Sequence, residues 1–190
     1  CIKLDTKILK TPAKKEMLLP TYALAKKIAA EWDRQVDEID PKSMPFTKSA
    51  NAALDKVVEQ IEEVSSLVCD YGDTDLLYYR ADSPAELKMR QQSSWDPIID
   101  WAKETFEVKI NCGTGILYIP QERELIYKLS KEISVLSSFQ LTGLYDIVSI
   151  TGSLILGLAT INGRLSAEEA FNLSRICLLY TSDAADEDLR

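Results

Sequence analysis

The sequence predicts an α+β protein that is mostly helical, with a small N-terminal α/β domain and a helical bundle after it. The first residues alternate between apolar and polar side chains, as strands do, whereas later segments repeat apolar residues at helical spacing. Apolar residues make up 46% of the 190 residues, which is enough to bury a core in one domain or two small ones.

Residues 2–12 are expected to form a β-hairpin. Ile2 and Leu4 alternate with a polar residue, and the pair Asp5-Thr6 is typical of the turn between two strands.

Residues 21–38 are predicted to form an amphipathic helix. Thr21 stands at the N-cap position, and Ile28, Trp32 and Val36 follow one another at steps of four residues. A tryptophan on such a stripe usually belongs to a core or an interdomain contact. The alternative is an exposed aromatic residue that binds a partner.

Residues 39–46, with the sequence IDPKSMPF, contain several turn-forming residues and mark the predicted domain boundary. We therefore assign residues 1–45 to the N-terminal α/β domain and residues 46–176 to the helical bundle. Thr47 is expected to cap a helix that runs to Cys69. The acidic outer face of this helix is typical of a solvated surface, and a metal or binding site there is the less favoured alternative.

Two helices are predicted to meet at a corner formed by Trp95. Ser83 and Glu86 form the pattern of a capping box, which marks the start of the first helix. Asp96 precedes Pro97, and a proline lacks the N–H that continues a helix, so a second helix should begin there. A corner that carries tryptophan usually indicates a packed junction.

Gly113 and Gly115 lie between two apolar pieces and invite comparison with a phosphate-binding loop. The segment lacks the Gly-Lys-Ser/Thr ending of that loop and the third glycine of a dinucleotide motif. A flexible connection or a small hairpin is predicted instead.

The remaining chain is predicted to be helical. Residues 121–137 are amphipathic, whereas residues 139–161 are apolar almost all round, as in a helix at the centre of a bundle. The Asn-Gly pair at 162–163 is typical of a helix end, and Ser166 with Glu169 forms another capping box that opens a last helix.

Both ends of the sequence differ from ordinary termini. The chain begins at Cys1 inside a predicted strand, so we expect further residues of the natural protein before it. Residues 177–190 abandon the amphipathic pattern and resemble translated adaptor sequence. We expect them to be a non-native tail and assign no function to any residue after Ile176.

The composition excludes several classes of function. The chain has 22 basic and 30 acidic residues and a net charge of −8, which argues against nucleic acid and anionic membrane surfaces as partners. No apolar run is long and uncharged enough for membrane insertion. Histidine is absent and the four cysteines are isolated, which argues against zinc and histidine-based catalysis and indicates a reducing compartment.

A carboxylate-dependent hydrolase is the remaining enzymatic hypothesis. Asp96 and Asp100 lie four residues apart and form the best acidic pair in the chain. The simpler interpretation is a helix cap and a solvent-facing acid, because acids in a first turn favour the helix dipole. Burial of both in one cleft with raised pKa values would support the enzyme.

Four short motifs occur in order along the chain. They are Glu31-Trp32, Met44-Pro45 with Thr47, Tyr79-Arg80, and Trp95-Asp96-Pro97. With their flanking segments, they resemble the assembly chaperones of the F-type ATP synthase that bind the alpha subunit, found in mitochondria and alphaproteobacteria. The resemblance extends over residues 3–175.

The resemblance implies a small α/β domain followed by an orthogonal helical bundle, without catalytic residues, nucleotide, cofactor or metal. The implied partner is the unassembled alpha subunit. Its exposed interface would be shielded from aggregation until the beta subunit displaces the chaperone. The resemblance also implies a monomer, in the mitochondrial matrix of a eukaryote or the cytoplasm of an alphaproteobacterium. A structural adaptor for another protein shares the same composition and is the further alternative.

Four large or charged residues on the matched segments are the candidate partner-binding residues, and a core role is the alternative for most of them. They are Trp32, Met44, Trp95 and Arg175. The sequence departs from the family pattern at the first turn, where Asp5-Thr6 replaces Asp-Gly. It also departs after Arg175, where the family continues with an acidic and aromatic stretch.

Overall fold

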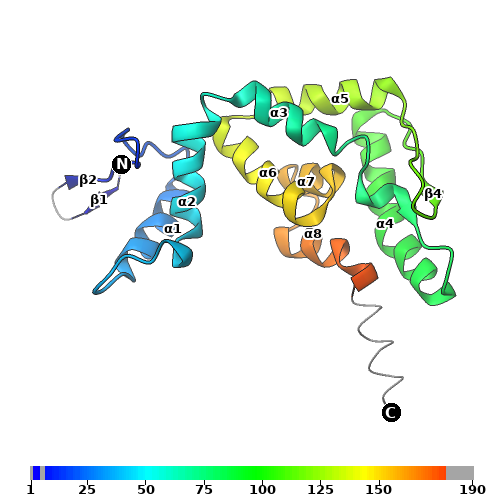
Figure 1. Cartoon of the computed structure of the whole chain (residues 1–190), viewed down its shortest axis with the longest axis horizontal. Coiled ribbons are helices and arrows are strands. Elements are labelled where there is room, and N and C mark those ends of the chain that lie inside the picture. The colour runs from blue at the N-terminus through cyan, green and yellow to red at the C-terminus, as the bar shows by residue number, and fades with distance from the viewer. Residues whose placement is uncertain (1, 5–6, 179–190) are drawn as a thin grey trace, which may run out of the picture. The chain divides into compact units, whose positions relative to one another are not determined.

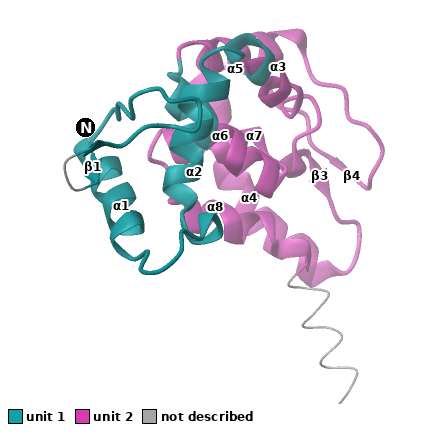
Figure 2. Cartoon of the chain, turned by 60° about the vertical axis from the view of Figure 1, so that its left-hand side comes forward, with its two compact units in different colours: residues 1–64, 136–143 teal, residues 65–135, 144–190 magenta. Residues whose placement is uncertain are grey.

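The computed structural model of the chain is mostly helical with a few very short strands, so the predicted α+β class is confirmed (Figure 1). The structure describes residues 2–4 and 7–178. The chain forms two compact units (Figure 2). Unit 1 holds residues 1–64 and 136–143, and unit 2 holds residues 65–135 and 144–190.

The two units contain different elements. Unit 1 contains β1 (Lys3–Leu4), β2 (Lys7–Ile8), α1 (Tyr22–Asp33), η1 (Pro41–Ser43), α2 (Pro45–Ala52) and η2 (Ala53–Val57). Unit 2 contains η3 (Leu76–Tyr78), β3 (Tyr79–Arg80), α4 (Ala85–Phe106), β4 (Gly113–Thr114), α5 (Arg123–Ser134), α7 (Leu154–Ile161) and α8 (Ala167–Ser174). The helices α3 (Ile61–Asp70) and α6 (Ser138–Thr151) contribute residues to both units.

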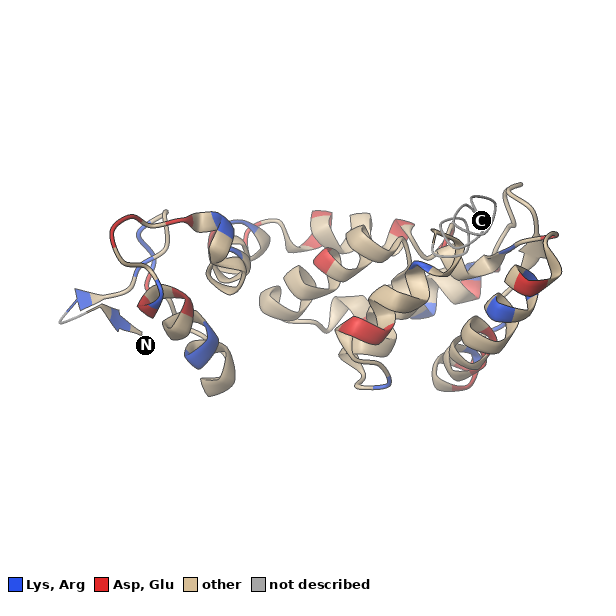
Figure 3. Cartoon of the chain, turned by 90° about the horizontal axis from the view of Figure 1, so that it is seen from below, with Lys and Arg blue, Asp and Glu red and all other residues tan. Residues whose placement is uncertain are grey.

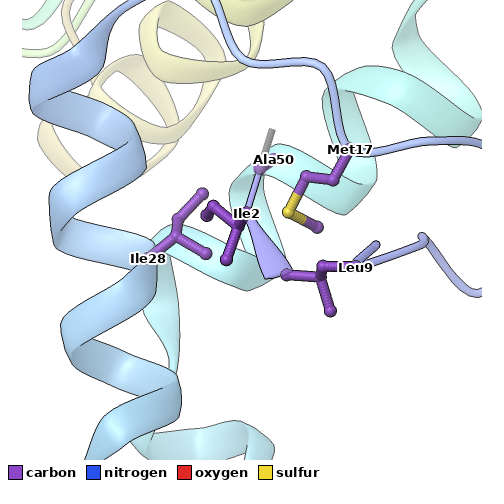
Figure 4. Packing of buried hydrophobic residues seen from close by; sticks show 5 residues of the cluster. All are labelled: Ile2, Leu9, Met17, Ile28 and Ala50. Carbon is purple, nitrogen blue, oxygen red and sulfur yellow. The ribbon is translucent and has the colours of Figure 1, made fainter. Parts of the chain in front are cut away.

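The predicted hairpin is confirmed at the N-terminus. β1 and β2 pair in antiparallel fashion, with Lys3 opposite Ile8 and Leu4 opposite Lys7. The residues that flank these strands point into unit 1, where the hairpin, the following loop, α1 and α2 meet in one apolar cluster. Figure 4 shows the buried members of this cluster, which are Ile2, Leu9, Met17, Ile28 and Ala50.

Helix α1 begins where the sequence predicts and ends earlier. The hydroxyl of Thr21 accepts a hydrogen bond from the Leu24 N–H at 3.2 Å, as an N-cap does. The helix ends at Asp33, before the predicted end, because the side chain of Gln35 organises the following turn. The Oε1 of Gln35 accepts a hydrogen bond from the Asp40 N–H at 2.8 Å.

Glu31 joins the two sides of the predicted boundary between residues 45 and 46. Its Oε1 accepts a hydrogen bond from the Phe46 N–H at 2.7 Å, and its Oε2 accepts from the Thr47 N–H and hydroxyl, both at 2.7 Å. This carboxylate therefore caps α2. Thr47, predicted to be the cap, lies inside the helix, whose first residue is Pro45. The predicted boundary falls within unit 1.

The segment predicted as one helix from Thr47 to Cys69 is interrupted. The π-helical turn η2 follows α2, and the Val58 N–H donates to the Ala53 carbonyl at 3.2 Å. This wider turn keeps Ala53 and Val57 buried while Val58 is exposed. The chain then turns and α3 begins.

The predicted corner at Trp95 is wrong, because α4 is one continuous helix with Pro97 inside it. The predicted capping box is also absent, since Pro84 occupies the N-cap position and no side chain caps this end. A proline inside a helix costs about 3 kcal/mol. Burial of the apolar face on both sides of it, including Leu87, Trp95 and Ala102, outweighs that cost.

The segment predicted as one apolar helix over 139–161 is two helices, α6 and α7. Gly152 adopts a φ of +70°, which ends α6, and Ser153 starts α7 by accepting a hydrogen bond from the Leu156 N–H at 3.0 Å. The later signals are confirmed, because Gly163 has a φ of +71° after α7 and Ser166 forms a complete capping box at α8.

A second short pairing replaces the small hairpin that was one prediction for the glycine-containing segment. β3 and β4 run parallel, with Tyr79 opposite Gly113 and Arg80 opposite Thr114. Helix α5 is confirmed within the predicted range 121–137.

Among residues 2–4 and 7–178, no helix combines the length and the hydropathy that crossing a membrane requires. The predicted non-native tail falls mainly on residues 179–190, which lie outside the described residues.

Candidate functional site

The four predicted partner-binding residues lie in different environments. Trp32 and Met44 line one pocket of unit 1, whereas Trp95 and Arg175 belong to unit 2.

Trp32 lies at the edge of the unit 1 core. Its ring is half-buried and packs against the apolar cluster of the hairpin and α1. Its indole N–H is buried and has no hydrogen-bond partner, which is unusual because a buried tryptophan N–H is normally paired. The structure therefore combines the two interpretations of this residue, since it contacts the core and also lines a pocket.

Met44 connects η1 to α2 and is 3% exposed. Its side chain can contribute the wall of the pocket but little direct contact area.

Trp95 is fully buried in unit 2, where it contacts Arg80 of another matched motif. Its indole N–H donates to the Leu173 carbonyl at 2.9 Å, and the Arg80 guanidinium lies 5.2 Å from its ring centroid. Arg80 also forms an ion pair with Asp96 at 2.8 Å. This burial favours the core role that the sequence also allowed.

Arg175 follows α8 and is half-buried. Its Nη2 donates to the Ile150 carbonyl at 3.0 Å, and its guanidinium lies 4.8 Å from the ring centroid of Phe171. Its Nε is buried without a partner. Most of the cation is thus committed to contacts inside unit 2.

The acidic pair proposed for a hydrolase does not form a buried dyad. The side chains of Asp96 and Asp100 are 51% and 63% exposed, and each is paired with a cation, Arg80 at 2.8 Å and Lys103 at 3.0 Å. Within the described ranges, no group of three histidine, cysteine or acidic residues is arranged to hold a metal ion.

Asp75 is, like Glu31, a buried carboxylate whose role sequence reasoning missed. It is fully buried, and its two oxygens accept hydrogen bonds from the Leu77 N–H at 2.9 Å and the Ile155 N–H at 2.8 Å. Burial raises the pKa of Asp75 to about 6, although these hydrogen bonds oppose the rise. Asp75 joins η3 to the start of α7, so its role is structural.

Unit 2 exposes two aliphatic side chains at the end of a well-anchored loop. Ile116 is 95% exposed and Leu117 is 82% exposed, and we call this pair the apolar tip. The sequence suggested a flexible connection or a small hairpin here. The signal that could have found the tip is its run of apolar residues without the spacing of a core helix.

Contacts on both sides hold the apolar tip in place. The Gly115 N–H donates to the Arg80 carbonyl at 2.8 Å, next to the pairing of β3 with β4. The Tyr118 hydroxyl donates to the Asp73 carboxylate at 2.8 Å. At the base of the loop, Asn111 and Gln121 exchange backbone and side-chain hydrogen bonds of 2.9 to 3.0 Å. A fixed loop that presents aliphatic side chains to water is typical of a protein-binding surface.

Unit 1 contains a pocket of about 590 Å³, which we call the unit 1 pocket. Its walls come from the loop over residues 10–12, from Trp32, from the linker over residues 39–44, and from α2 and η2. Apolar side chains supply much of the lining, and lysines lie around it. A pocket of this size and composition is suited to bind a ligand or part of a partner chain.

Comparisons with known proteins give one consistent result. The family model of the ATP12 chaperone protein matches residues 1–103. The crystal structure of Atp12 from Paracoccus denitrificans is 45% identical in sequence, with a TM-score of 0.90, and the match covers 95% of this chain and 78% of that one. A point variant of the same Paracoccus protein matches equally well, with 77% of its chain covered. A candidate chaperone from Agrobacterium tumefaciens is 34% identical with a TM-score of 0.89, over 96% of this chain and 68% of that one.

Proposed function

Because the chain belongs to the ATP12 chaperone family, which acts in ATP synthase assembly, we propose that it binds the unassembled alpha subunit of the F-type ATP synthase. Binding would shield the alpha-subunit surface that later meets the beta subunit, and the beta subunit would then displace the chaperone. The observation that carries this proposal is the match of nearly the whole chain to the Paracoccus Atp12 structure.

The apolar tip is the client contact that we propose. Ile116 and Leu117 cannot be part of this chain's core, because both are almost fully exposed. Burying one large aliphatic side chain at an interface contributes about 1.5–3 kcal/mol, so the pair could contribute about 3–6 kcal/mol to client binding. Since about 1.4 kcal/mol corresponds to a factor of ten in affinity, the tip could account for a factor of about 100 or more.

The test uses purified alpha subunit diluted from denaturant, with light scattering to follow aggregation and gel filtration to detect a complex. The chain should suppress scattering and elute with the alpha subunit. The double variant Ile116→Ser/Leu117→Ser should bind about 100-fold more weakly. The matched control is Val36→Ser/Val135→Ser, which removes two other well-exposed apolar side chains and should change affinity by no more than about twofold.

Absence of binding to the isolated alpha subunit would overturn the proposed function. Unchanged affinity of the Ile116→Ser/Leu117→Ser variant would remove the apolar tip from the interface and leave the chaperone function intact. We place this activity in the mitochondrial matrix or the alphaproteobacterial cytoplasm. A fractionation experiment in the source organism tests that placement.

A further inference from the structure

The unit 1 pocket carries a local charge opposite in sign to that of the chain. Lys10, Lys48 and Lys56 line it, all three are exposed, and none forms an ion pair within the described part of the chain. The chain as a whole has a net charge of −8, and Figure 3 shows acidic and basic residues in both parts of it. A cluster of unpaired lysines in such a chain favours an acidic ligand.

The pocket lining holds three lysines and one carboxylate, that of Asp55, so positive charge remains in excess. Asp55 accepts a hydrogen bond from the Thr11 hydroxyl at 2.6 Å and another from the Ala13 N–H at 3.1 Å. These contacts hold the loop against η2 and so build one wall of the pocket.

Apolar side chains between the lysines can receive an apolar group. Trp32, Ile39 and Met44 are among the lining residues. Ile39 lies in the linker between α1 and η1 and is 58% exposed. An apolar side chain of a ligand would cover this surface and remove it from water.

Two polar atoms of lining residues have no hydrogen-bond partner. They are the indole Nε1 of Trp32, which is a donor, and the Oδ1 of Asn51, which is an acceptor. Buried polar atoms are almost always paired, so both need an explanation. Both atoms have almost no exposed surface, so a ligand in the pocket would meet the lysines and the apolar side chains and not this pair.

We propose that the unit 1 pocket binds an extended polypeptide segment in which an apolar side chain lies next to a carboxylate side chain. The apolar side chain would cover Trp32 and Ile39, and the carboxylate would meet Lys48 and Lys56. The identity of this segment as part of the client rests on the proposed function, whereas its chemistry rests on the pocket alone.

The test measures fluorescence anisotropy of two labelled synthetic peptides of about ten residues, which span about 33 Å when extended. One peptide alternates leucine and aspartate in a serine and glycine background, and the other carries lysine in place of aspartate. The chain should bind the acidic peptide, and added salt should weaken binding. The variant Lys48→Glu/Lys56→Glu should lower affinity for the acidic peptide at least about tenfold and raise affinity for the basic one.

Matched variants separate the pocket from general charge and from misfolding. Lys88→Glu/Lys109→Glu makes the same charge change at two exposed lysines of unit 2 and should leave affinity within about twofold. Lys48→Gln/Lys56→Gln removes the two charges without reversing them and should give an intermediate loss. Circular dichroism of each variant verifies the fold.

Three outcomes would overturn the inference. One is no binding of the acidic peptide at about 1 mM. Another is binding that the Lys48 and Lys56 variants do not change. The third is that a single-stranded oligonucleotide binds, that the Lys48 and Lys56 variants weaken its binding, and that the acidic peptide does not bind.

An experiment with the full alpha subunit separates this inference from the proposed function. Equal binding by wild type and the Lys48→Glu/Lys56→Glu variant would refute only the pocket, whereas peptide binding without alpha-subunit binding would refute only the chaperone role.

Discussion

Replacing Glu31 by alanine should lower the free energy of unfolding of unit 1 by about 3–5 kcal/mol. Glu31 is 1% exposed, and its carboxylate accepts three hydrogen bonds of 2.7 Å from the first turn of α2. A hydrogen bond to a charged group contributes about 1.5–3 kcal/mol. Phe46 is exposed, so water can replace its bond, and only the two contacts to buried Thr47 count in full. Those two hydrogen bonds contribute about 3–6 kcal/mol. Water that enters the space left by the Glu31 side chain would bond to the free donors and reduce the loss.

The variant Glu31→Gln separates charge from shape. It keeps the size of the side chain and one acceptor oxygen, but its NH₂ group faces the N–H donors of α2. We expect it to lose about half as much stability as Glu31→Ala, or about 2 kcal/mol. Glu38→Ala is the matched control, because Glu38 is exposed and forms no ion pair within the described residues, and it should change stability by less than about 0.5 kcal/mol.

Urea unfolding combined with hydrogen exchange gives the measurement. Exchange of the amides at Phe46 and Thr47 should accelerate in Glu31→Ala before the amides of unit 2 respond, because the lost cap lies in unit 1. A loss below about 1 kcal/mol in Glu31→Ala would refute the reasoning that this carboxylate caps α2. Faster exchange across unit 2 at the same denaturant concentration would show that the two units unfold together.

Three further predictions concern the carboxylate of Asp75, the proline inside α4, and two glycines of α6 and α7. Asp75 has a folded pKa of about 6 against an ordinary value of 3.8, so the stability it contributes is fully present below about pH 4 and is lost as pH rises through 6. This difference in pKa corresponds to about 3 kcal/mol. Urea unfolding should show that the free energy of unfolding declines from pH 4 to 7 in the wild type and not in Asp75→Asn. Parallel curves of stability against pH for the two proteins would contradict this prediction. Pro97→Ala restores a backbone N–H inside α4 and should raise the free energy of unfolding by about 1–3 kcal/mol. An unchanged melting temperature would contradict the cost assigned to this proline. Gly157→Ala would place a Cβ 2.6 Å from the Leu144 Cδ1 and 2.9 Å from the Val148 Cγ2, and should cost about 1–3 kcal/mol. Gly143→Ala meets no atom within 4 Å and should stabilise the helix by about 0.5–1 kcal/mol, so thermal unfolding of this pair should shift in opposite directions.

The sequence predicted helix ends correctly where neighbouring residues determine them. Thr21 and Ser166 form their caps with backbone groups three residues later, and Gly163 supplies a conformation that glycine adopts readily. Such signals are complete within a few residues, so no knowledge of the fold is needed to interpret them.

Two of the predictions that were wrong depended on contacts that are distant in sequence. The cap of α2 comes from Glu31, and the nearest plausible local residue, Thr47, proved to be its hydrogen-bond donor. Pro97 does not end a helix because burial on both sides holds the helix together. The break at Gly152 and Ser153 is a local signal that was missed, because it lies within a segment that is apolar almost all round.

The candidate sites show the same limit. Trp32 was identified from its stripe, but no local pattern connects it with Asn51 or Lys48, because separate segments of the chain form the unit 1 pocket. Trp95 belongs to a matched motif and is fully buried, so membership in a motif did not distinguish core from surface.

The contact between Arg80 and the Trp95-Asp96 pair has a consequence for how relatives of this chain diverge. One guanidinium both covers the indole ring and pairs with the carboxylate, so these positions are not free to drift separately. We expect substitutions at positions 80 and 96 to covary, with loss of the cation accompanied by loss of the acid. Distant relatives that exchanged both together would score poorly in a search that treats each position alone. They would be recovered by one that scores the two positions jointly.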